Sequence, residues 1–596
     1  MPWTESVPKQ ASWMNTRMTK AAMTPDFLRQ QIVGVDSTFK TPFGERLMVY
    51  CDYTASGRCL RFVESYLQSL QRVYANTHTE DDITGRSMSQ LLHEAEEAIK
   101  KSVNAGPSGR IVACGTGATG AIDKLQQIIG VALAPATRKN IEEVLDNADG
   151  DIDAERFREA LDDRQPVVFI GPYEHHSNEI SWRQSVATTI EVQLDPAGNI
   201  DLAHLEALLK DPRYKNRKRI GSFSAASNVT GIRSDVRGIA SLLHKYDAMA
   251  CFDFAACAPY VDIDMNPEPA GEDDDPSIDA IFISPHKFLG GPGSSGVLVF
   301  NERIYDRELP PSVSAGGTVD YVGMKDQDFI SRIEEREKAG TPGVLQTLKA
   351  GLVFQIKDSV GVDVINAREH ELTDRAMKSW GQNENIEVLG NPDPSSRVGI
   401  ISFNVKDTDG KYLHHKFMTA LLNDLFGIQS RAGCSCAGPY GHRLLDIDED
   451  RSERYRFAVQ QGYCGLKPGW CRVGLHWVMD DAEAQYVIGA VHFLANEGHQ
   501  FLALYDFDLA TGTWKHKYAE LDLPEFSLDA ALSNVGGEPA RLSLALRQQL
   551  YDHYMTEARR LATRLRNEPA ARCTSLEGEL EELQFFTMPA GETKRH

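Results

Sequence analysis

Within residues 46–340, hydrophobic and polar positions from roughly Leu47 to Phe300 alternate between short apolar runs and longer amphipathic stretches. The runs predict buried strands and the stretches predict helices, so this part of the chain is expected to form one α/β domain with a mixed, mostly parallel sheet between helices. The predicted strands are 110–113, 167–170, 189–194, 220–224, 248–253, 280–283 and 296–300, and the predicted helices are 88–103, 117–131, 202–209 and 236–246. Residues 1–45 form a separate N-terminal segment in this interpretation.

The pattern changes beyond residue 340. A long helix that runs through Ile356 and Ala367 is followed by strand patterns at 397–405 and 471–474, which predicts a smaller α+β domain over 341–505. Residues 506–596 form a C-terminal extension, with a helix over 541–567 and an acidic helical piece near 577–582, and the sequence assigns it no role. Two charged segments, 137–165 and 267–276, are predicted to be solvated surface loops.

Composition and charge exclude several classes of protein. The chain has 596 residues, of which 42% are hydrophobic and 25% charged, as in ordinary globular proteins. Its net charge of -22 argues against nucleic-acid binding, which needs a basic face. No apolar run reaches the roughly 18 residues of a membrane span, so no membrane association is expected. Residues 1–23 lack the apolar centre of a secretory signal, which predicts a cytoplasmic protein. The basic residues of this segment leave an organelle transit peptide as an alternative.

The ten cysteines are scattered along the chain and imply a reducing compartment rather than a disulfide framework. Cys434 and Cys436 are closely spaced. A second Cys or His pair at ligand spacing does not follow them in the sequence, so no metal site is predicted.

One lysine stands out as chemically placed. Lys287 comes just past the predicted strand 280–283, is preceded by Ser284 and His286, and is followed by a glycine-rich turn. A single lysine at a strand end usually just reaches solvent. In this setting it suits a Schiff base with pyridoxal phosphate (PLP), whose phosphate the hydroxyl, the imidazole and backbone N–H groups would hold.

An acidic residue at the end of another strand strengthens this interpretation. Asp253 ends the apolar run 248–253, and a carboxylate on a buried strand needs a cationic partner. The protonated ring nitrogen of PLP is such a partner, because the cofactor withdraws electrons only while that nitrogen keeps its proton. Asp253 and Lys287 are therefore predicted to hold the two ends of one PLP molecule.

Further segments complete a possible cofactor site. Thr116, Gly117 and Ala118 lie between a strand and a helix, where small residues let a phosphate approach backbone N–H groups. His175 follows strand 167–170 and could lie flat on the pyridine ring, and Asn228 could donate to the cofactor's phenolic oxygen. Each motif alone has a simpler interpretation as a turn, a helix start or a surface histidine.

Together, in this order, these segments resemble the class V aminotransferase family of PLP-dependent enzymes, and within it the branch of cysteine desulfurases and selenocysteine lyases. The resemblance covers roughly residues 50–498 and implies the fold of type I PLP-dependent transferases. It implies ring stacking for His175, phosphate contacts for Ser284 and His286, and a place near the substrate for Ala55, Asn76 and His78. It also implies that Thr341 reaches the phosphate of a neighbouring subunit, and hence a homodimer with shared active sites.

The second domain contains two more segments that resemble this family. Cys471-Arg472-Val473-Gly474 is similar to the strand whose arginine binds the substrate's α-carboxylate, a role that suits the bidentate fork of Arg472. The segment 431–439 is similar to the loop that carries the nucleophilic cysteine, which places this role on Cys436, with Arg431 nearby to favour a thiolate. A redox-inert loop cysteine is the alternative.

The sequence also departs from the branch at three positions. Ala256 stands where desulfurases usually carry Gln, Cys434-Ser435 stands where paired histidines often precede the nucleophile, and Ala118 stands where an acidic residue is expected.

The leading hypothesis is desulfuration of L-cysteine, or of a related sulfur or selenium amino acid, with a Cys436 persulfide and alanine as products and a sulfur-acceptor protein as partner. Lys287 would move the α-proton. The alternatives are an aminotransferase or β-lyase in which Cys436 is not catalytic, and a non-catalytic scaffold or sulfur-carrier partner.

Overall fold

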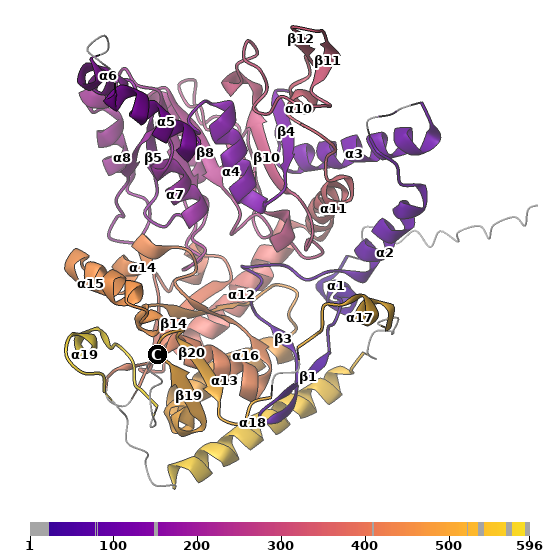
Figure 1. Cartoon of the computed structure of the whole chain (residues 1–596). Helices are drawn as coiled ribbons and strands as arrows, with labels where there is room; N and C mark the ends of the chain where they lie inside the picture. Colours follow the sequence, from indigo (N-terminus) through magenta and orange to yellow (C-terminus); the bar gives the residue numbers. More distant parts are fainter. Residues whose placement is uncertain are drawn as a thin grey trace, which may run out of the picture.

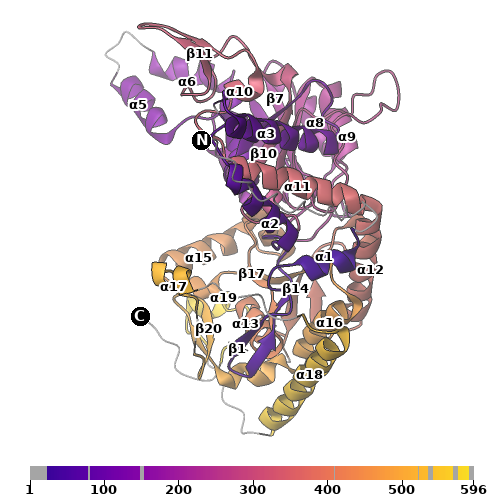
Figure 2. The same ribbon diagram turned by 90° about the vertical axis from the view of Figure 1, so that its right-hand side faces the viewer.

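The computed structural model describes residues 23–77, 79, 81–147, 153–407, 410–520, 523–533, 541–567 and 575–589. They form two lobes, one built around a large sheet covered by helices and one built around a smaller sheet with long helices along its side (Figure 1). In the view turned by 90°, α11 (Val344–Val360) runs along the first lobe and α12 (Val362–Trp380) leads down into the second (Figure 2).

The large sheet has seven strands in the order β4-β10-β9-β8-β7-β5-β6. These are β4 (Gly109–Cys114), β5 (Val167–Ile170), β6 (Thr188–Glu191), β7 (Arg219–Ser224), β8 (Ala248–Asp253), β9 (Ala280–Ile283) and β10 (Gly296–Asn301). β10 is antiparallel to both of its neighbours and the other pairs are parallel, so the prediction of a mixed, mostly parallel sheet is confirmed. The parallel strands end at one edge, where open α/β sheets bind ligands.

Alternate strand residues pack into two different cores, as the pleat of a strand requires. Val168 and Ile170 contact the core beneath α4 (Gly117–Ile128) and α7 (His176–Arg183), whereas Val167 and Phe169 contact the core on the opposite face. The helices of that face are α3 (Ile83–Ser102), α8 (Leu202–Leu209), α9 (Val236–Lys245) and α11. Burial on both faces explains why these strands are apolar throughout rather than alternating.

The charged segment 137–165 is not the loop that its composition predicted. It contributes α5 (Pro135–Asp146) and α6 (Ala154–Asp162), two helices that lie on the outside of the large lobe (Figure 1). Ion pairs from Arg158 to Glu142 (2.9 Å) and to Asp146 (2.6 Å) join the helices. The abundant charges stabilise exposed helical faces here, so a charge-rich composition was a poor guide to local conformation.

The long helix predicted through Ile356 and Ala367 is also wrong in detail, because it is two helices. α11 and α12 meet at Gly361, whose φ of +90° lies outside the helical region. Glycine adopts this conformation without the steric penalty that a Cβ would add. The chain therefore turns between the lobes at this residue.

The smaller sheet has the order β13-β14-β18-β17, with β15 paired to β14, and all of its pairs are antiparallel. Its strands are β13 (Ile386–Val388), β14 (Ile400–Lys406), β15 (Tyr412–Leu413), β17 (Arg431–Gly433) and β18 (Trp470–Gly474). The surrounding helices are α13 (His415–Phe426), α14 (Gly438–Leu444), α15 (Glu449–Gln460) and α16 (Asp481–Glu497). The predicted strands 397–405 and 471–474 correspond to β14 and β18.

Both ends of the described chain pack against the smaller lobe. At the N-terminal side these are α1 (Pro25–Gln31), β1 (Thr38–Thr41), β2 (Gly44–Leu47) and β3 (Val49–Tyr50), and β3 pairs in parallel with β16 (Ile428–Gln429). The C-terminal extension adds β19 (Tyr505–Asp508), β20 (Thr513–His516), α17 (Leu528–Ser533), α18 (Leu544–Arg566) and α19 (Glu579–Leu583). On α18, the ring of Tyr551 stacks on Tyr486 of α16 at 4.2 Å between centroids. None of the described helices is long and apolar enough to span a bilayer.

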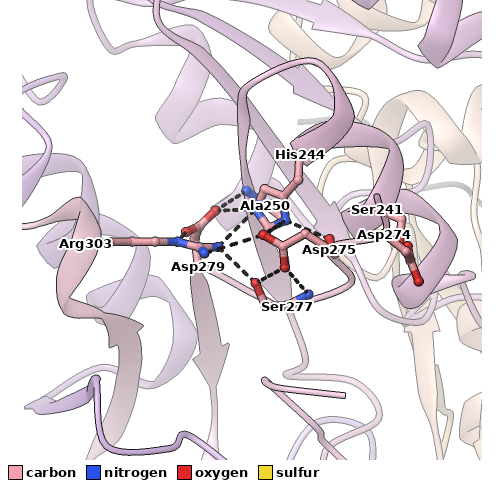
Figure 3. Close-up of polar contacts among 8 residues, drawn as sticks. All are labelled: Ser241, His244, Ala250, Asp274, Asp275, Ser277, Asp279 and Arg303. Carbon is pink, nitrogen blue, oxygen red and sulfur yellow. Dashed lines mark hydrogen bonds and ion pairs between the residues drawn. The ribbon is translucent and has the colours of Figure 1, made fainter. Parts of the chain in front are cut away.

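A buried ionic cluster lies at the end of the large sheet where β8 and β9 begin (Figure 3). Asp279, 3% exposed, accepts hydrogen bonds from His244 Nε2 (2.9 Å), Arg303 Nε (2.5 Å) and the amide of Ala250 (2.8 Å). The other ring nitrogen of His244 lies 2.9 Å from the carbonyl oxygen of Asp275, in the acidic segment 267–276. That segment is a loop, as predicted, but its Asp275 is held in this cluster rather than simply solvated.

The cluster has a definite pH dependence. Burial is the largest single effect on His244 and opposes its charged form, but the hydrogen bonds to Asp279 and Asp275 and the charges of these two residues together outweigh burial and raise the pKa above 6.5. Burial likewise opposes the charge of Asp279, yet the hydrogen bonds from His244 and Arg303 lower its pKa below 3.8. The contribution of the His244 charge to the free energy of unfolding is complete below the pKa of histidine in the unfolded chain. It is lost as the pH rises through the raised pKa of the folded state. The contribution of the Asp279 charge is complete above the pKa of aspartate in the unfolded chain and is lost as the pH falls through the lowered pKa of the folded state. Both contributions to stability are therefore present between about pH 4 and pH 6.5.

We therefore expect His244→Gln to lower the free energy of unfolding by about 1.5–3 kcal/mol near pH 6, the range for hydrogen bonds to charged groups. The difference from the unchanged protein should shrink as the pH rises toward about 9, because His244 of the unchanged protein then loses its charge in the folded state and the contribution of that charge disappears. Urea unfolding of the variant and of the unchanged protein, repeated between these pH values, measures the difference in the free energy of unfolding. A difference that does not vary with pH would show that the histidine is not charged in the folded state.

Candidate active site

A cavity of ≈ 200 Å³ lies where β5, β7, β8 and β9 end, between the two lobes. It gathers most of the residues that the sequence singled out. Its lining consists of Thr54, Ala55, Thr116, Ala118, Thr119, His175, Ser177, Ser224, Ala226, Asn228, Asp253, Ala255, Ala256, Ser284, His286, Lys287, Arg431, Ser435 and Arg472. Segments that are distant in sequence, including Arg472 of the smaller lobe, thus contribute to one site.

Lys287 and Asp253 lie in this cavity as an amine and a buried acid. Lys287 ends the short 3-10 turn Pro285–Lys287 after β9, and none of the described residues accepts a hydrogen bond from its Nζ. Burial lowers its pKa to about 8, against the opposing effect of the Asp253 charge. Asp253 ends β8 with its Oδ1 accepting from the amide of Ala255 at 2.8 Å, and burial raises its pKa. A lysine with this pKa is partly neutral at physiological pH and can act as a nucleophile or a base.

The N-terminus of α4 forms a compact cradle beside this pair. Gly117 has φ +63°, and a Cβ there would lie 2.8 Å from His286 Cε1 and 2.9 Å from Ser284 Oγ, so glycine is required. The amide of Ala118 donates to Ser284 Oγ at 2.9 Å. Burial lowers the pKa of His286 to about 4, so its ring is neutral near pH 7. The cradle therefore offers hydroxyl, imidazole and backbone donors at a helix N-terminus, a favourable place for a phosphate.

The strand end that carries His175 is braced by a residue to which the sequence analysis gave no role. Glu174, 2% exposed, accepts hydrogen bonds from the amide (2.8 Å) and hydroxyl (2.6 Å) of Ser224 and from Asn178 (2.7 Å), and burial raises its pKa to about 7. His175 is the N-cap residue of α7, and its Nδ1 accepts from the amide of Ser177 at 3.1 Å. Burial, together with the Lys287 charge, lowers the pKa of His175 to about 4. A neutral imidazole is thus held at the cavity wall.

Asp52 joins the two arginines of the site, and sequence reasoning did not assign it. Its Oδ1 accepts from Arg472 at 3.0 Å and its Oδ2 lies 3.2 Å from Arg431 Nε. Arg472, 3% exposed, also donates to the carbonyl oxygen of Asn228 at 2.9 Å. The signal that could have found Asp52 is its place beside Ala55 in the motif 52–56, where a buried arginine fork needs an anionic partner.

The loop that carries Cys436 is fixed to the large lobe by hydrogen bonds. Asn228 Nδ2 donates to the carbonyl oxygen of Ser435 at 2.6 Å. The backbone amide of His176 donates to the carbonyl oxygen of Cys436 at 2.8 Å. Ser435 Oγ and Asn228 Oδ1 are buried without a hydrogen-bond partner in the described part of the chain. Two such atoms at one wall mark a place where a ligand could supply the missing partner.

Several predicted residues lie outside the cavity lining. Cys436 is exposed, and its neighbour Ser435 lines the cavity instead. Asn76 Nδ2 donates to Thr341 Oγ1 at 3.2 Å, and both residues are exposed and away from the cavity. His78 falls outside the described residues. The predicted contact of Thr341 with a neighbouring subunit therefore stays a prediction.

The residues present fit PLP. An amine of lowered pKa, a buried acid, a phosphate cradle at a helix N-terminus and a histidine at the wall share one cavity. Asn228 Oδ1 remains without a partner at the same wall. This set matches the aldehyde, ring nitrogen, phosphate and ring face that PLP presents.

Comparison with known proteins agrees with the geometry. The Aminotransferase class-V family model matches residues 154–487. A probable cysteine desulfurase of Halalkalibacterium halodurans is 28% identical over 307 residues, which is 51% of this chain and 69% of that protein. A probable cysteine desulfurase of Streptomyces coelicolor is 25% identical over 393 residues, covering 66% of this chain and 84% of that protein.

Solved structures show the same fold. A cysteine desulfurase from Thermococcus onnurineus superposes with a TM-score of 0.57 at 19% identity, covering 75% of this chain and 94% of that one. A cysteine desulfurase from Escherichia coli superposes with a TM-score of 0.57 at 18% identity, covering 79% and 98%. The predicted type I fold is confirmed. Since the family match extends over more than half of the sequence, the chain belongs to the class-V aminotransferase family of PLP-dependent enzymes.

Proposed function

We propose that the protein is a cysteine desulfurase-like enzyme that takes sulfur from L-cysteine, or from a related sulfur or selenium amino acid, onto Cys436 and releases alanine. The observation that carries the proposal is the cysteine loop itself. Its backbone is held at the cavity by Asn228 and His176, two residues of the large lobe. The names of the curated relatives support the same reaction class.

PLP, when bound, supplies an electron sink for negative charge that develops on the substrate. The chain's own residues provide the rest. Lys287 would hold the cofactor aldehyde, and with a pKa of about 8 its amine can take and return the substrate's α-proton near neutral pH. Asp253 would pair with the ring nitrogen, and Ser284 with His286 would hold the phosphate at the start of α4, since all three residues line the cavity.

Arg472 provides the fork for the substrate's α-carboxylate, because a guanidinium binds a carboxylate through two parallel hydrogen bonds. Asp52 accepts a hydrogen bond from this fork at 3.0 Å and also contacts Arg431, so it holds the two arginines beside each other at the cavity. The two arginines and Asp52 together carry one net positive charge, which would draw an amino acid into the cavity with its carboxylate toward the smaller lobe.

Cys436 is the sulfur acceptor in this proposal. Its thiolate attacks the substrate sulfur, the bond between the β-carbon and that sulfur breaks, and the electron pair of the bond stays with carbon. In the net reaction L-cysteine and the Cys436 thiol give L-alanine and a Cys436 persulfide, so the thiol proton ends on the alanine methyl group. The persulfide requires a recipient, which is a sulfur-acceptor protein in the simplest version. A homodimer, in which Thr341 faces the partner's site, is part of the same proposal.

Replacing Cys436 by serine tests the proposed reaction. We expect alanine formation from L-cysteine to fall at least about 10³-fold, because serine cannot accept the sulfur atom. Absorbance of the bound cofactor should not change, since Cys436 lies outside the cavity lining. The measurement is alanine and sulfide release under single-turnover conditions, with Cys464→Ser as the control at a half-buried cysteine outside the lining. Alanine formation at the unchanged rate in Cys436→Ser would exclude the proposal.

A second candidate is an aminotransferase or β-lyase on the same scaffold. It is favoured by the exposure of Cys436, by Ser435 in its place at the cavity wall, and by Ala256 where desulfurases carry Gln. For this function Cys436→Ser should leave turnover unchanged. The products then distinguish the two, because a β-lyase yields pyruvate with sulfide and a transaminase yields a keto acid, whereas a desulfurase yields alanine.

A further inference from the structure

The two cysteines of the loop differ from the other described cysteines. Cys434 and Cys436 are exposed, Cys59 and Cys464 are half-buried, and the remaining five are buried. Both exposed thiols stand beside Ser435, which lines the cavity. Cys436 also lies within electrostatic reach of the Arg472 guanidinium. The mouth of the candidate active site thus presents two accessible thiols that are separated by one residue, Ser435.

The backbone places the two cysteines at the first and third positions of a tight turn. The amide of Ala437 donates to the carbonyl oxygen of Cys434 at 3.0 Å, and the two central residues, Ser435 and Cys436, have φ of 51° and 58°. A hydrogen bond from the fourth residue to the first, with positive φ at both central positions, defines a type I′ turn. Residues other than glycine rarely adopt a backbone conformation with positive φ. Its occurrence at two successive residues, one of them the proposed nucleophile, points to a functional constraint.

The geometry is compatible with a bond between the two sulfurs. Residues two apart are separated by at most about 7 Å between Cα atoms even in extended chain, and by less in a turn. Disulfides form over Cα separations of roughly 4.4–6.8 Å. Hydrogen bonds from His176 and Asn228 hold the carbonyls of Cys436 and Ser435, which leaves both thiol side chains free to react.

We propose that Cys434 is a resolving thiol that releases the transferred sulfur as free sulfide. The inference rests on the proposed function. The Cys434 thiolate attacks Sγ of the Cys436 persulfide, the bond from that Sγ to the terminal sulfur breaks, and HS⁻ leaves with the electron pair. A disulfide between Cys434 and Cys436 remains, and a dithiol reductant returns it to two thiols by supplying two electrons. The protein then needs a reductant rather than a sulfur-acceptor protein to complete its cycle.

The test is a single turnover of the reduced holoenzyme, without air or reductant, with L-cysteine below the enzyme concentration. The unchanged protein should yield equal amounts of alanine and sulfide and lose about 2 Da as a disulfide forms. Cys434→Ser should yield the same alanine, retain about 32 Da on the peptide of Cys436, and release sulfide at least about tenfold more slowly. Addition of dithiothreitol to this variant should then release the retained sulfur.

Two controls make the outcome decisive. Cys434→Ala should behave like Cys434→Ser, and Cys464→Ser should behave like the unchanged protein. Sulfide release by Cys434→Ser at the normal rate overturns the inference, and so does a persulfide that survives in the unchanged protein. In both of these cases alanine still forms, so the proposed function stands. Absence of alanine from the unchanged protein overturns the proposed function and this inference together.

Discussion

Lys287→Ala is expected to lower kcat for any amino-acid substrate by at least about 10⁴-fold, because one change removes both the amine that holds the cofactor and the base that moves the α-proton. The lysine is suited to both tasks by the burial that lowers its pKa to about 8. The long-wavelength absorbance of the protein-bound cofactor should also disappear. Steady-state turnover and the absorption spectrum of the purified variant measure the two effects.

Lys357 offers a matched control for this experiment. It is 4% exposed, donates to the carbonyl oxygen of Val261, and burial lowers its pKa to about 8, as for Lys287. It does not line the cavity. Lys357→Met should therefore keep the cofactor absorbance and turnover of the folded protein. Loss of the absorbance in this variant, or its survival in Lys287→Ala, would contradict the assignment of the cofactor lysine.

Asp253→Asn is expected to have the second largest effect, a decrease in kcat of about 10²–10⁴-fold. The carboxylate would keep the ring nitrogen of PLP protonated, whereas a neutral amide of the same shape cannot. Asp253 is 4% exposed at the end of β8, so solvent offers little replacement for the lost charge. Kinetics with saturating cofactor separate this effect from weaker cofactor binding.

The ionic cluster at the other edge of the sheet supplies the control. Asp279 is also a buried aspartate, but it pairs with His244 and Arg303 near the starts of β8 and β9. Asp279→Asn should reduce stability and leave kcat of the folded enzyme nearly unchanged. If Asp279→Asn and Asp253→Asn lowered kcat equally, the loss would reflect a perturbed sheet rather than a contact with the cofactor.

The cofactor-binding half of the site was predictable because its residues stand at the ends of buried parallel strands. Asp253 and Lys287 follow adjacent strands, β8 and β9, and adjacent parallel strands must end side by side. Gly117 was identified for a related reason, since a phosphate cradle needs a residue without Cβ. In these places the local pattern determines the tertiary position.

The substrate-facing half depends on contacts between residues distant in sequence, which no local pattern encodes. Asp52 contacts Arg472 across 420 positions, and Asn228 contacts Ser435 across 207. Ser435 rather than Cys436 lines the cavity, and both are the central residues of a type I′ turn that the sequence pattern does not reveal. The helices α5 and α6 were missed because their charged residues are paired on exposed faces, which composition alone does not distinguish from a loop.

Reduction of the purified holoenzyme with borohydride, followed by proteolysis and mass mapping, tests the account most directly. A Schiff base between cofactor and lysine becomes a stable secondary amine under these conditions and marks the residue that formed it. The account predicts that the pyridoxyl label is found on the peptide that contains Lys287. A label on Lys357 or on another lysine, or no label on a protein that binds the cofactor, would contradict it.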